Sequence, residues 1–112
     1  MTPLKLVETV PGSFSLLLDA GTTQVDEAVR QLGHEPHGYF WTGIARFLVS
    51  TEAASLEGRF SYDPEAGMFC AYGKDRAALE ELGALLSAVT RDEDRVRTLV
   101  ADAQAAGIDL DD

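Results

Sequence analysis

The sequence predicts an α+β domain in which a small antiparallel sheet of two β-hairpins packs with about four helices, in the order ββ-α-α-ββ-α-α. Two pairs of short apolar runs are each joined by a turn that contains proline and glycine. Between and after these pairs, apolar residues recur at intervals of three and four, which is typical of amphipathic helices. The 112 residues suffice for one core, so we expect a single domain over residues 1–112.

The first hairpin joins two strands of unequal burial. The run LKLVETV at residues 4–10 is rich in β-prone side chains, whereas SFSLLLDA at residues 13–20 is more apolar and is expected deeper in the sheet. Pro11 and Gly12 between them are a turn signal, because proline fixes φ and glycine tolerates left-handed backbone angles.

Two helices are predicted before the second hairpin. The first is short, ends near Gly33, and carries an apolar stripe of Val25, Ala28, Val29 and Leu32. The second has a broad apolar face that includes Phe40, Ile44, Phe47 and Leu48. Only Thr42 and Arg46 in it are clearly polar, which places this helix in the middle of the domain.

The second hairpin is predicted over residues 59–73, RFSYDPEAGMFCAYG. Its turn is DPEAG at residues 63–67, where proline and glycine supply the backbone angles that a turn needs. Cys70 lies in phase with Met68 and Tyr72 in the second strand, and we expect it to be a small buried hydrophobic residue.

Two helices and an acidic tail complete the chain. Asp75 is expected to cap the third helix, whose core stripe is Leu79, Leu82, Leu85, Leu86 and Val89. Thr90 and Glu93 form a capping box for the fourth, whose stripe is Val96, Leu99, Val100 and Ala103. The tail at residues 108–112 is expected either to add an edge strand or to stay loose.

The charge balance restricts the classes of partner. Nine Lys and Arg against nineteen Asp and Glu give a formal net charge of -10. Phosphate would repel such a chain, so neither nucleic acid nor an anionic membrane is an expected partner. A positively charged protein is favoured in both encounter rate and specificity. The single cysteine, Cys70, rules out an internal disulfide and suits the cytoplasm.

The segment GHEPHGYFW at residues 33–41 contains both histidines. A small enzyme or metal-binding protein centred on His34, His37 and Cys70 is therefore one alternative. The two histidines lack the spacing of one helical turn, Pro36 lies between them, and no helix begins after Cys70 to lower its pKa. We accordingly expect no catalytic residue, no metal and no cofactor.

The aromatic residues of the same segment indicate a binding surface. Tyr39 and Trp41 flank Phe40 and cannot both share its face, so one of them is expected at the surface as an interface anchor. If two loops converge, the contact surface comprises Glu35, His37, Tyr39, Trp41, Asp63 and Glu65. The same aromatic surface could instead join two copies of the chain in a homodimeric adaptor, so both monomer and homodimer remain open.

Four segments resemble the immunity protein 51 family of bacterial polymorphic toxin systems: PGSFSLLLDAGTTQVDEAV, GHEPHGYFWTGIARFLV, DPEAGMFCAYG and AAGIDLDD. The resemblance runs from about Val7 to Asp112. The family pattern has asparagine at the position of His37 and an acidic residue at that of Thr42, so a function peculiar to His37 does not carry over. The resemblance implies a cytoplasmic, non-enzymatic antidote that binds and blocks a cognate toxin, for which a basic nuclease would suit the acidic balance.

Overall fold

A computed structural model describes residues 3–111 and confirms the α+β class and the order of the elements. A short 3-10 helix, η1 (Ala54–Leu56), follows the second helix. Within residues 3–111 no helix is long and apolar enough to cross a bilayer. The strands and helices are β1 (Lys5–Val10), β2 (Ser13–Asp19), α1 (Asp26–Gln31), α2 (Gly38–Glu52), β3 (Ser61–Tyr62), β4 (Met68–Gly73), α3 (Arg76–Val89) and α4 (Glu93–Ala105).

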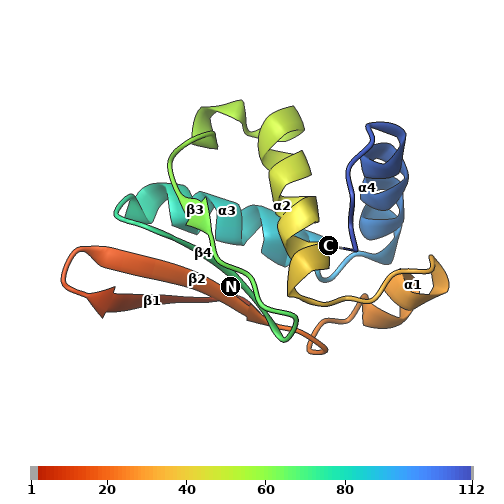
Figure 1. Cartoon of the computed structure of the whole chain (residues 1–112), viewed down its shortest axis with the longest axis horizontal. Helices are drawn as coiled ribbons and strands as arrows, with labels where there is room; N and C mark the ends of the chain where they lie inside the picture. The colour runs from red at the N-terminus through yellow and green to blue at the C-terminus, as the bar shows by residue number, and fades with distance from the viewer. Residues whose placement is uncertain (1–2, 112) are drawn as a thin grey trace.

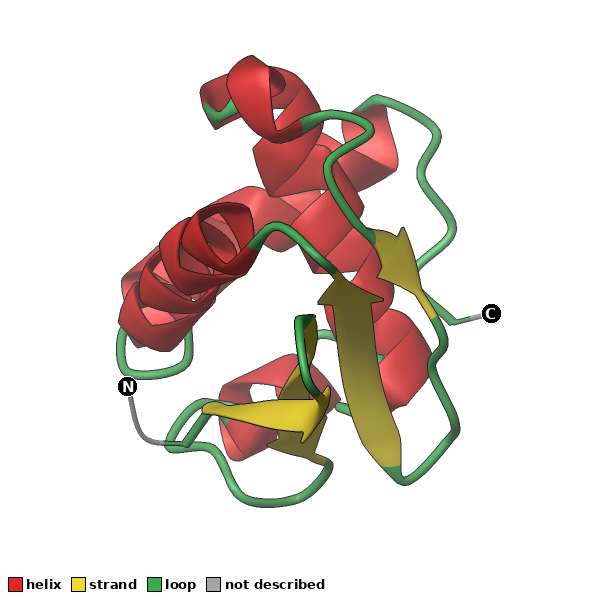
Figure 2. Cartoon of the chain, turned by 90° about the vertical axis from the view of Figure 1, so that its left-hand side faces the viewer, coloured by secondary structure: helices red, strands yellow, loops and turns green. Residues whose placement is uncertain are grey.

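The two predicted hairpins join into one antiparallel sheet of four strands in the order β1-β2-β4-β3. They meet where β2 pairs with β4, in a register that runs from Phe14 opposite Gly73 to Asp19 opposite Met68. Helices α2 and α3 pack against the sheet, and α4 lies beyond α2, where it also contacts α1 (Figure 1). Figure 2 shows the same arrangement turned by 90°, with β4 as the long strand beside the helices.

The inner face of the sheet is formed by Leu16 and Leu18 of β2 and by Phe69 and Ala71 of β4, all at 0% exposure. Cys70 lies in phase with Met68 and Tyr72 as predicted, but the expectation that it is a buried core residue is wrong. These three residues lie on the opposite face, where Tyr72 is 45% exposed and Cys70 is partly buried. Because every side chain from Met68 to Tyr72 is apolar or aromatic, alternation along the strand does not reveal which set faces the core.

Helix α2 is the central helix, as predicted. Phe40, Trp41 and Ile44 are at 0% exposure, so they form part of the core beneath the sheet. Trp41 therefore cannot serve as a surface anchor, and its place among the candidate contact residues is corrected. Tyr39 is the partly exposed member of the pair. The reason is that α2 is apolar almost all round, so sequence spacing alone does not choose between the two residues.

The start of the last helix differs from the prediction. Asp92, not Thr90, is the cap of α4, and its Oδ1 accepts a hydrogen bond from the Arg95 N–H at 3.0 Å. Thr90 instead ends α3 and is buried, with its hydroxyl donating to the Ser87 carbonyl oxygen at 2.8 Å. Asp75 caps α3 as expected, with its Oδ1 accepting from the Ala78 N–H at 3.0 Å.

The C-terminal segment neither adds a strand nor stays loose within the described residues; Asp112 lies outside them. Leu110 is 1% exposed and belongs to the core. It packs so closely on α2 that a Cβ atom added to Gly43 would lie 2.8 Å from Leu110 Cδ2. The glycine in α2 therefore makes room for the tail.

Candidate functional site

The turn at residues 63–67 touches the start of α2, so the two predicted loops converge. The Gly38 N–H donates to the Ala66 carbonyl oxygen at 3.0 Å. A Cβ atom at Gly38 would lie 2.7 Å from the Met68 carbonyl carbon and would overlap the carbonyl oxygens of Glu65 and Met68. Only glycine permits this approach of two backbones, which makes one surface from segments about thirty residues apart.

His37 fixes the direction in which α2 begins. Its Nδ1 accepts a hydrogen bond from the Phe40 N–H at 3.0 Å, so the side chain acts as the helix cap. Because Nδ1 accepts, the neutral ring carries its proton on Nε2. The ring also lies edge-on to Tyr39, with 5.4 Å between centroids. His37 thus positions Tyr39 at the surface.

His34 has a separate structural role. Its Nε2 lies 2.7 Å from Gln104 Nε2, and its Nδ1 lies 2.8 Å from Asp111 Oδ1. The glutamine amide nitrogen can only donate, so His34 Nε2 accepts and the Nδ1–H donates to the carboxylate. Both ring nitrogens are therefore engaged, and this buried histidine ties the loop after α1 to α4 and the tail. Sequence reasoning missed these partners, since they lie 70 and 77 residues away.

The residues of the metal or enzyme alternative lie in three different settings. Cys70 lies opposite Leu17 on the open side of the sheet, where burial raises the pKa of its thiol and so disfavours the thiolate. The nitrogens of His34 are engaged with Gln104 and Asp111, and His37 Nδ1 is used as a helix cap. Across residues 3–111, no group of three or more His, Cys, Asp or Glu side chains could hold a metal ion.

The acidic candidates lie on the two converging loops, but Asp63 faces the open side of the sheet, where it lines a cavity with Cys70. Glu35 is exposed and its Oε1 lies 3.5 Å from Arg30 Nε, an ion pair at the surface that contributes about 1 kcal/mol or less. Asp63 and Glu65 are exposed on the turn, and in the described part of the chain neither forms an ion pair. Their carboxylates are therefore available to a partner.

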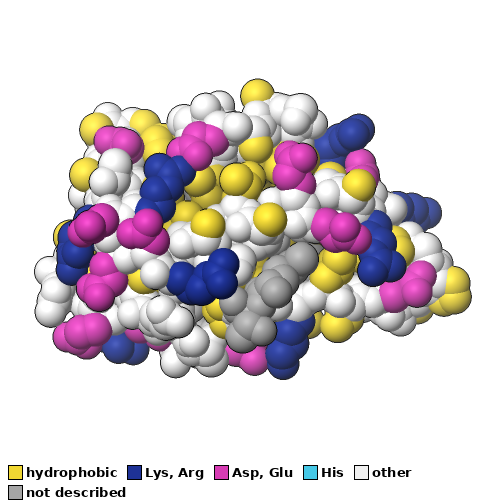
Figure 3. Space-filling view, turned by 180° about the vertical axis from the view of Figure 1, so that it is seen from behind, with side chains coloured by type: hydrophobic (Ala, Val, Ile, Leu, Met, Phe, Trp, Pro, Cys, Tyr) yellow, Lys and Arg dark blue, Asp and Glu magenta, His cyan; other side chains and the backbone are white. Residues whose placement is uncertain are grey.

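Elsewhere much of the acidic charge is matched locally by basic side chains. On α3 and α4, Arg76 pairs with Glu80 and Arg97 with Glu93, at 2.8 and 3.2 Å. The face in Figure 3, opposite to that of Figure 1, shows Asp and Glu interspersed with Lys and Arg, with apolar side chains between them. The net charge of -10 is therefore not gathered into one acidic patch on that face.

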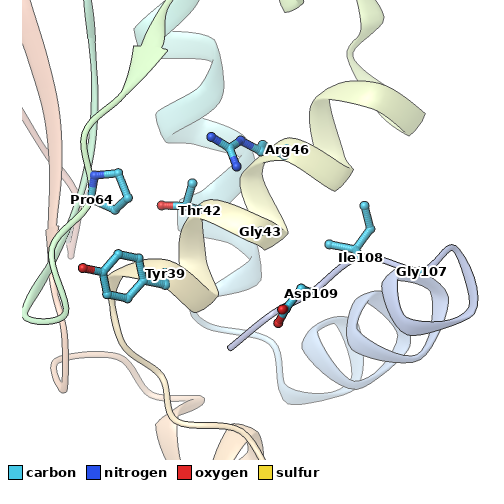
Figure 4. A pocket seen from close by; sticks show the side chains of 8 residues that line it. All are labelled: Tyr39, Thr42, Gly43, Arg46, Pro64, Gly107, Ile108 and Asp109. Carbon is cyan, nitrogen blue, oxygen red and sulfur yellow. The ribbon is translucent and has the colours of Figure 1, made fainter. Parts of the chain in front are cut away.

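A groove of about 450 Å³ runs along α2 beside Tyr39. Its floor and one end come from Tyr39, Thr42 and Arg46, and its walls from Pro64 on the turn and from Ile108 and Asp109 near the C-terminus (Figure 4). We call this the α2 groove. Sequence reasoning missed all of these residues except Tyr39. The available signal was Arg46, which lies two helical turns after Tyr39 and is strongly polar in an apolar helix.

Comparison with known proteins identifies a family. A family model described as immunity protein 51 matches residues 4–105 of the 112-residue chain. The matched region includes every strand and helix from β1 to α4 and therefore both converging loops. No curated protein and no solved structure matches the chain.

Proposed function

Because the chain belongs to the immunity protein 51 family, we propose that it is a cytoplasmic, non-enzymatic antidote that binds a cognate toxin and blocks it. The proposed contact is the convergent surface, which we define as Glu35, His37, Tyr39, Asp63 and Glu65. The observation that carries this placement is the backbone contact between Gly38 and Ala66, because it unites the loop before α2 with the turn of the second hairpin.

The chemistry of the convergent surface suits a basic partner. Tyr39 offers an aromatic ring and a hydroxyl group, and tyrosine is among the residues that dominate the energetics of protein interfaces. Glu35 offers an exposed carboxylate in the loop before α2, and Asp63 and Glu65 offer two more on the turn that touches this loop. A nuclease toxin holds phosphate with Lys and Arg, so an acidic rim can occupy the same side chains and speed the encounter. A basic nuclease is therefore the class of toxin that we favour.

The support under this surface also favours tight binding. Tyr39 projects from the first turn of α2, whose start is fixed by the His37 cap and by the hydrogen bond from Gly38. Residues held in this way lose little conformational freedom when a partner binds, which lowers the entropic cost of association.

Co-expression with the toxin encoded beside this gene tests the proposal. We expect the chain to restore growth of cells that produce the toxin and to co-purify with it. The absence of both growth rescue and a complex would overturn the proposed function.

Charge reversal at one point of the convergent surface tests its location. We expect Glu65→Lys to weaken toxin binding about tenfold or more, because it places a like charge against a basic face. The control is Glu81→Lys on α3, which changes the charge by the same amount. Glu81 is also exposed, and it forms no ion pair among residues 3–111. Calorimetry should show the control within about threefold of the unmodified protein. Equal losses would mean that net charge alone matters and that the surface is placed wrongly.

A further inference from the structure

Arg46 lacks the carboxylate or carbonyl partner that every other arginine in residues 3–111 has. This is unexpected in a chain with nineteen acidic and nine basic residues. Arg91 donates to the Ser87 carbonyl oxygen, and ion pairs engage Arg30, Arg59, Arg76, Arg95 and Arg97. Arg46 is exposed, and its guanidinium instead lies over the ring of Tyr62 in β3, with 5.1 Å from Cζ to the ring centroid.

The contact with Tyr62 holds Arg46 without neutralising it. Burial raises the pKa of Tyr62 to about 12, so the phenol is uncharged at neutral pH and offers only the face of its ring. Glu57 also acts on this phenol through its charge, but no ion pair within residues 3–111 joins it to Arg46. Because this contact uses only the face of the Tyr62 ring, the guanidinium N–H groups can still form two parallel hydrogen bonds with a carboxylate.

Arg46 also lines the α2 groove. Arg46 and Tyr39 lie on one face of α2, about 10 Å apart along the axis by helix geometry. Thr42 lies between them, and its hydroxyl is already used by the Gly38 carbonyl oxygen at 2.8 Å. In Figure 4 the guanidinium lies toward β3, whereas Asp109 lies at the other wall, near the C-terminal segment. The groove thus has a cationic end, an aromatic end, and a wall formed by apolar Ile108 and acidic Asp109.

We propose that the α2 groove receives a loop of the toxin that presents an aspartate or glutamate carboxylate to Arg46. This inference rests on the proposed function for the identity of the partner. The carboxylate forms two hydrogen bonds with the guanidinium, while Tyr39 and Ile108 cover the adjoining part of the loop. General attraction between an acidic antidote and a basic toxin brings the two together, and this single pair of reversed sign then selects the cognate toxin from other basic proteins.

The sign of the expected effect separates this contact from general electrostatics. Removing a positive charge from an antidote of charge -10 should strengthen its long-range attraction to a basic toxin. If removal of the Arg46 charge weakens toxin binding, the cause is therefore a local contact between Arg46 and a group on the toxin.

The experiment measures binding of the inactivated toxin encoded beside this gene. We expect Arg46→Gln to weaken binding about tenfold or more, as for loss of a hydrogen-bonded charge pair. Arg46→Lys should restore only part of the affinity, because lysine lacks the planar fork. The matched control is Arg97→Gln on α4, which removes the same charge from an existing pair with Glu93 and should bind as tightly as the unmodified protein or more tightly. All three variants should keep the thermal stability of the unmodified protein, since both arginines are exposed.

The partner carboxylate is then identified by replacing each acidic residue of the toxin with its amide. One replacement should weaken binding to the unmodified antidote and have no further effect with Arg46→Gln. A complex that Arg46→Gln leaves unaltered overturns this inference but leaves the proposed function standing. The inference is also overturned if Arg46→Gln weakens binding but no amide replacement in the toxin does. If the unmodified antidote forms no complex at all, the proposed function and this inference fail together.

Discussion

Replacement of Gly38 by alanine is expected to lower the free energy of unfolding by about 3 kcal/mol, the upper part of the range for overpacked sites. Alanine normally stabilises a helical position relative to glycine by about 1 kcal/mol, so a loss here has a specific cause. The added Cβ would overlap the carbonyl oxygens of Glu65 and Met68, which are backbone atoms and cannot rotate away. The hairpin turn would have to separate from α2, and the convergent surface would open.

Gly67→Ala is the matched control for this substitution. Gly67 lies in the same turn, but a Cβ atom there would meet nothing within 4 Å. The free energy of unfolding of Gly67→Ala should stay within about 1 kcal/mol of that of the unmodified protein. Urea denaturation followed by fluorescence suits the comparison, because Trp41 is the only tryptophan and is fully buried. Equal stability of the two variants would contradict the tight contact between α2 and the turn.

Leu110→Ala is expected to lower the free energy of unfolding by about 2–4 kcal/mol, as for leucine truncation in other protein cores. Leu110 is 1% exposed and packs on α2 at Gly43, so its removal leaves a cavity beside the central helix. The cost is large for the third residue from the end of the sequence, a region where substitutions are usually tolerated.

The control for Leu110 is Val10→Ala in β1, where the side chain is 59% exposed and its truncation should cost about 0.5 kcal/mol or less. Both variants are measured by the same urea denaturation. If Leu110→Ala were as stable as Val10→Ala, the tail would contribute nothing to the core.

The helices could be predicted because their apolar residues recur with one clear period. The predicted stripe of α4 is buried at every position, and Asp75 caps α3 as expected. Prediction was wrong where the pattern had no polar residues to orient it. In β4 either alternate set could face the core, so Cys70 was placed on the wrong side. In α2 the same uniformity hid the difference between Trp41 and Tyr39.

The site could be predicted only as a set of residues that had to converge. Sequence spacing places Glu35 and Glu65 in separate loops, and the contact that unites them depends on a hydrogen bond from Gly38 to Ala66. The α2 groove likewise requires the C-terminal segment to return to α2, which depends on Leu110 and on the pairing of His34 with Asp111. Such long-range packing leaves no local pattern, so these contacts come only from the folded chain.

Amide hydrogen exchange of the protein, alone and bound to the neighbouring toxin, tests the convergent surface most directly. We expect binding to slow exchange about tenfold or more at residues 37–39 and 65–68, because a partner there excludes water and suppresses local opening. Amides of β1 should exchange equally in both states, since this strand lies at the other edge of the sheet from β3. Protection of β1 with unaltered exchange at the convergent surface would contradict the account.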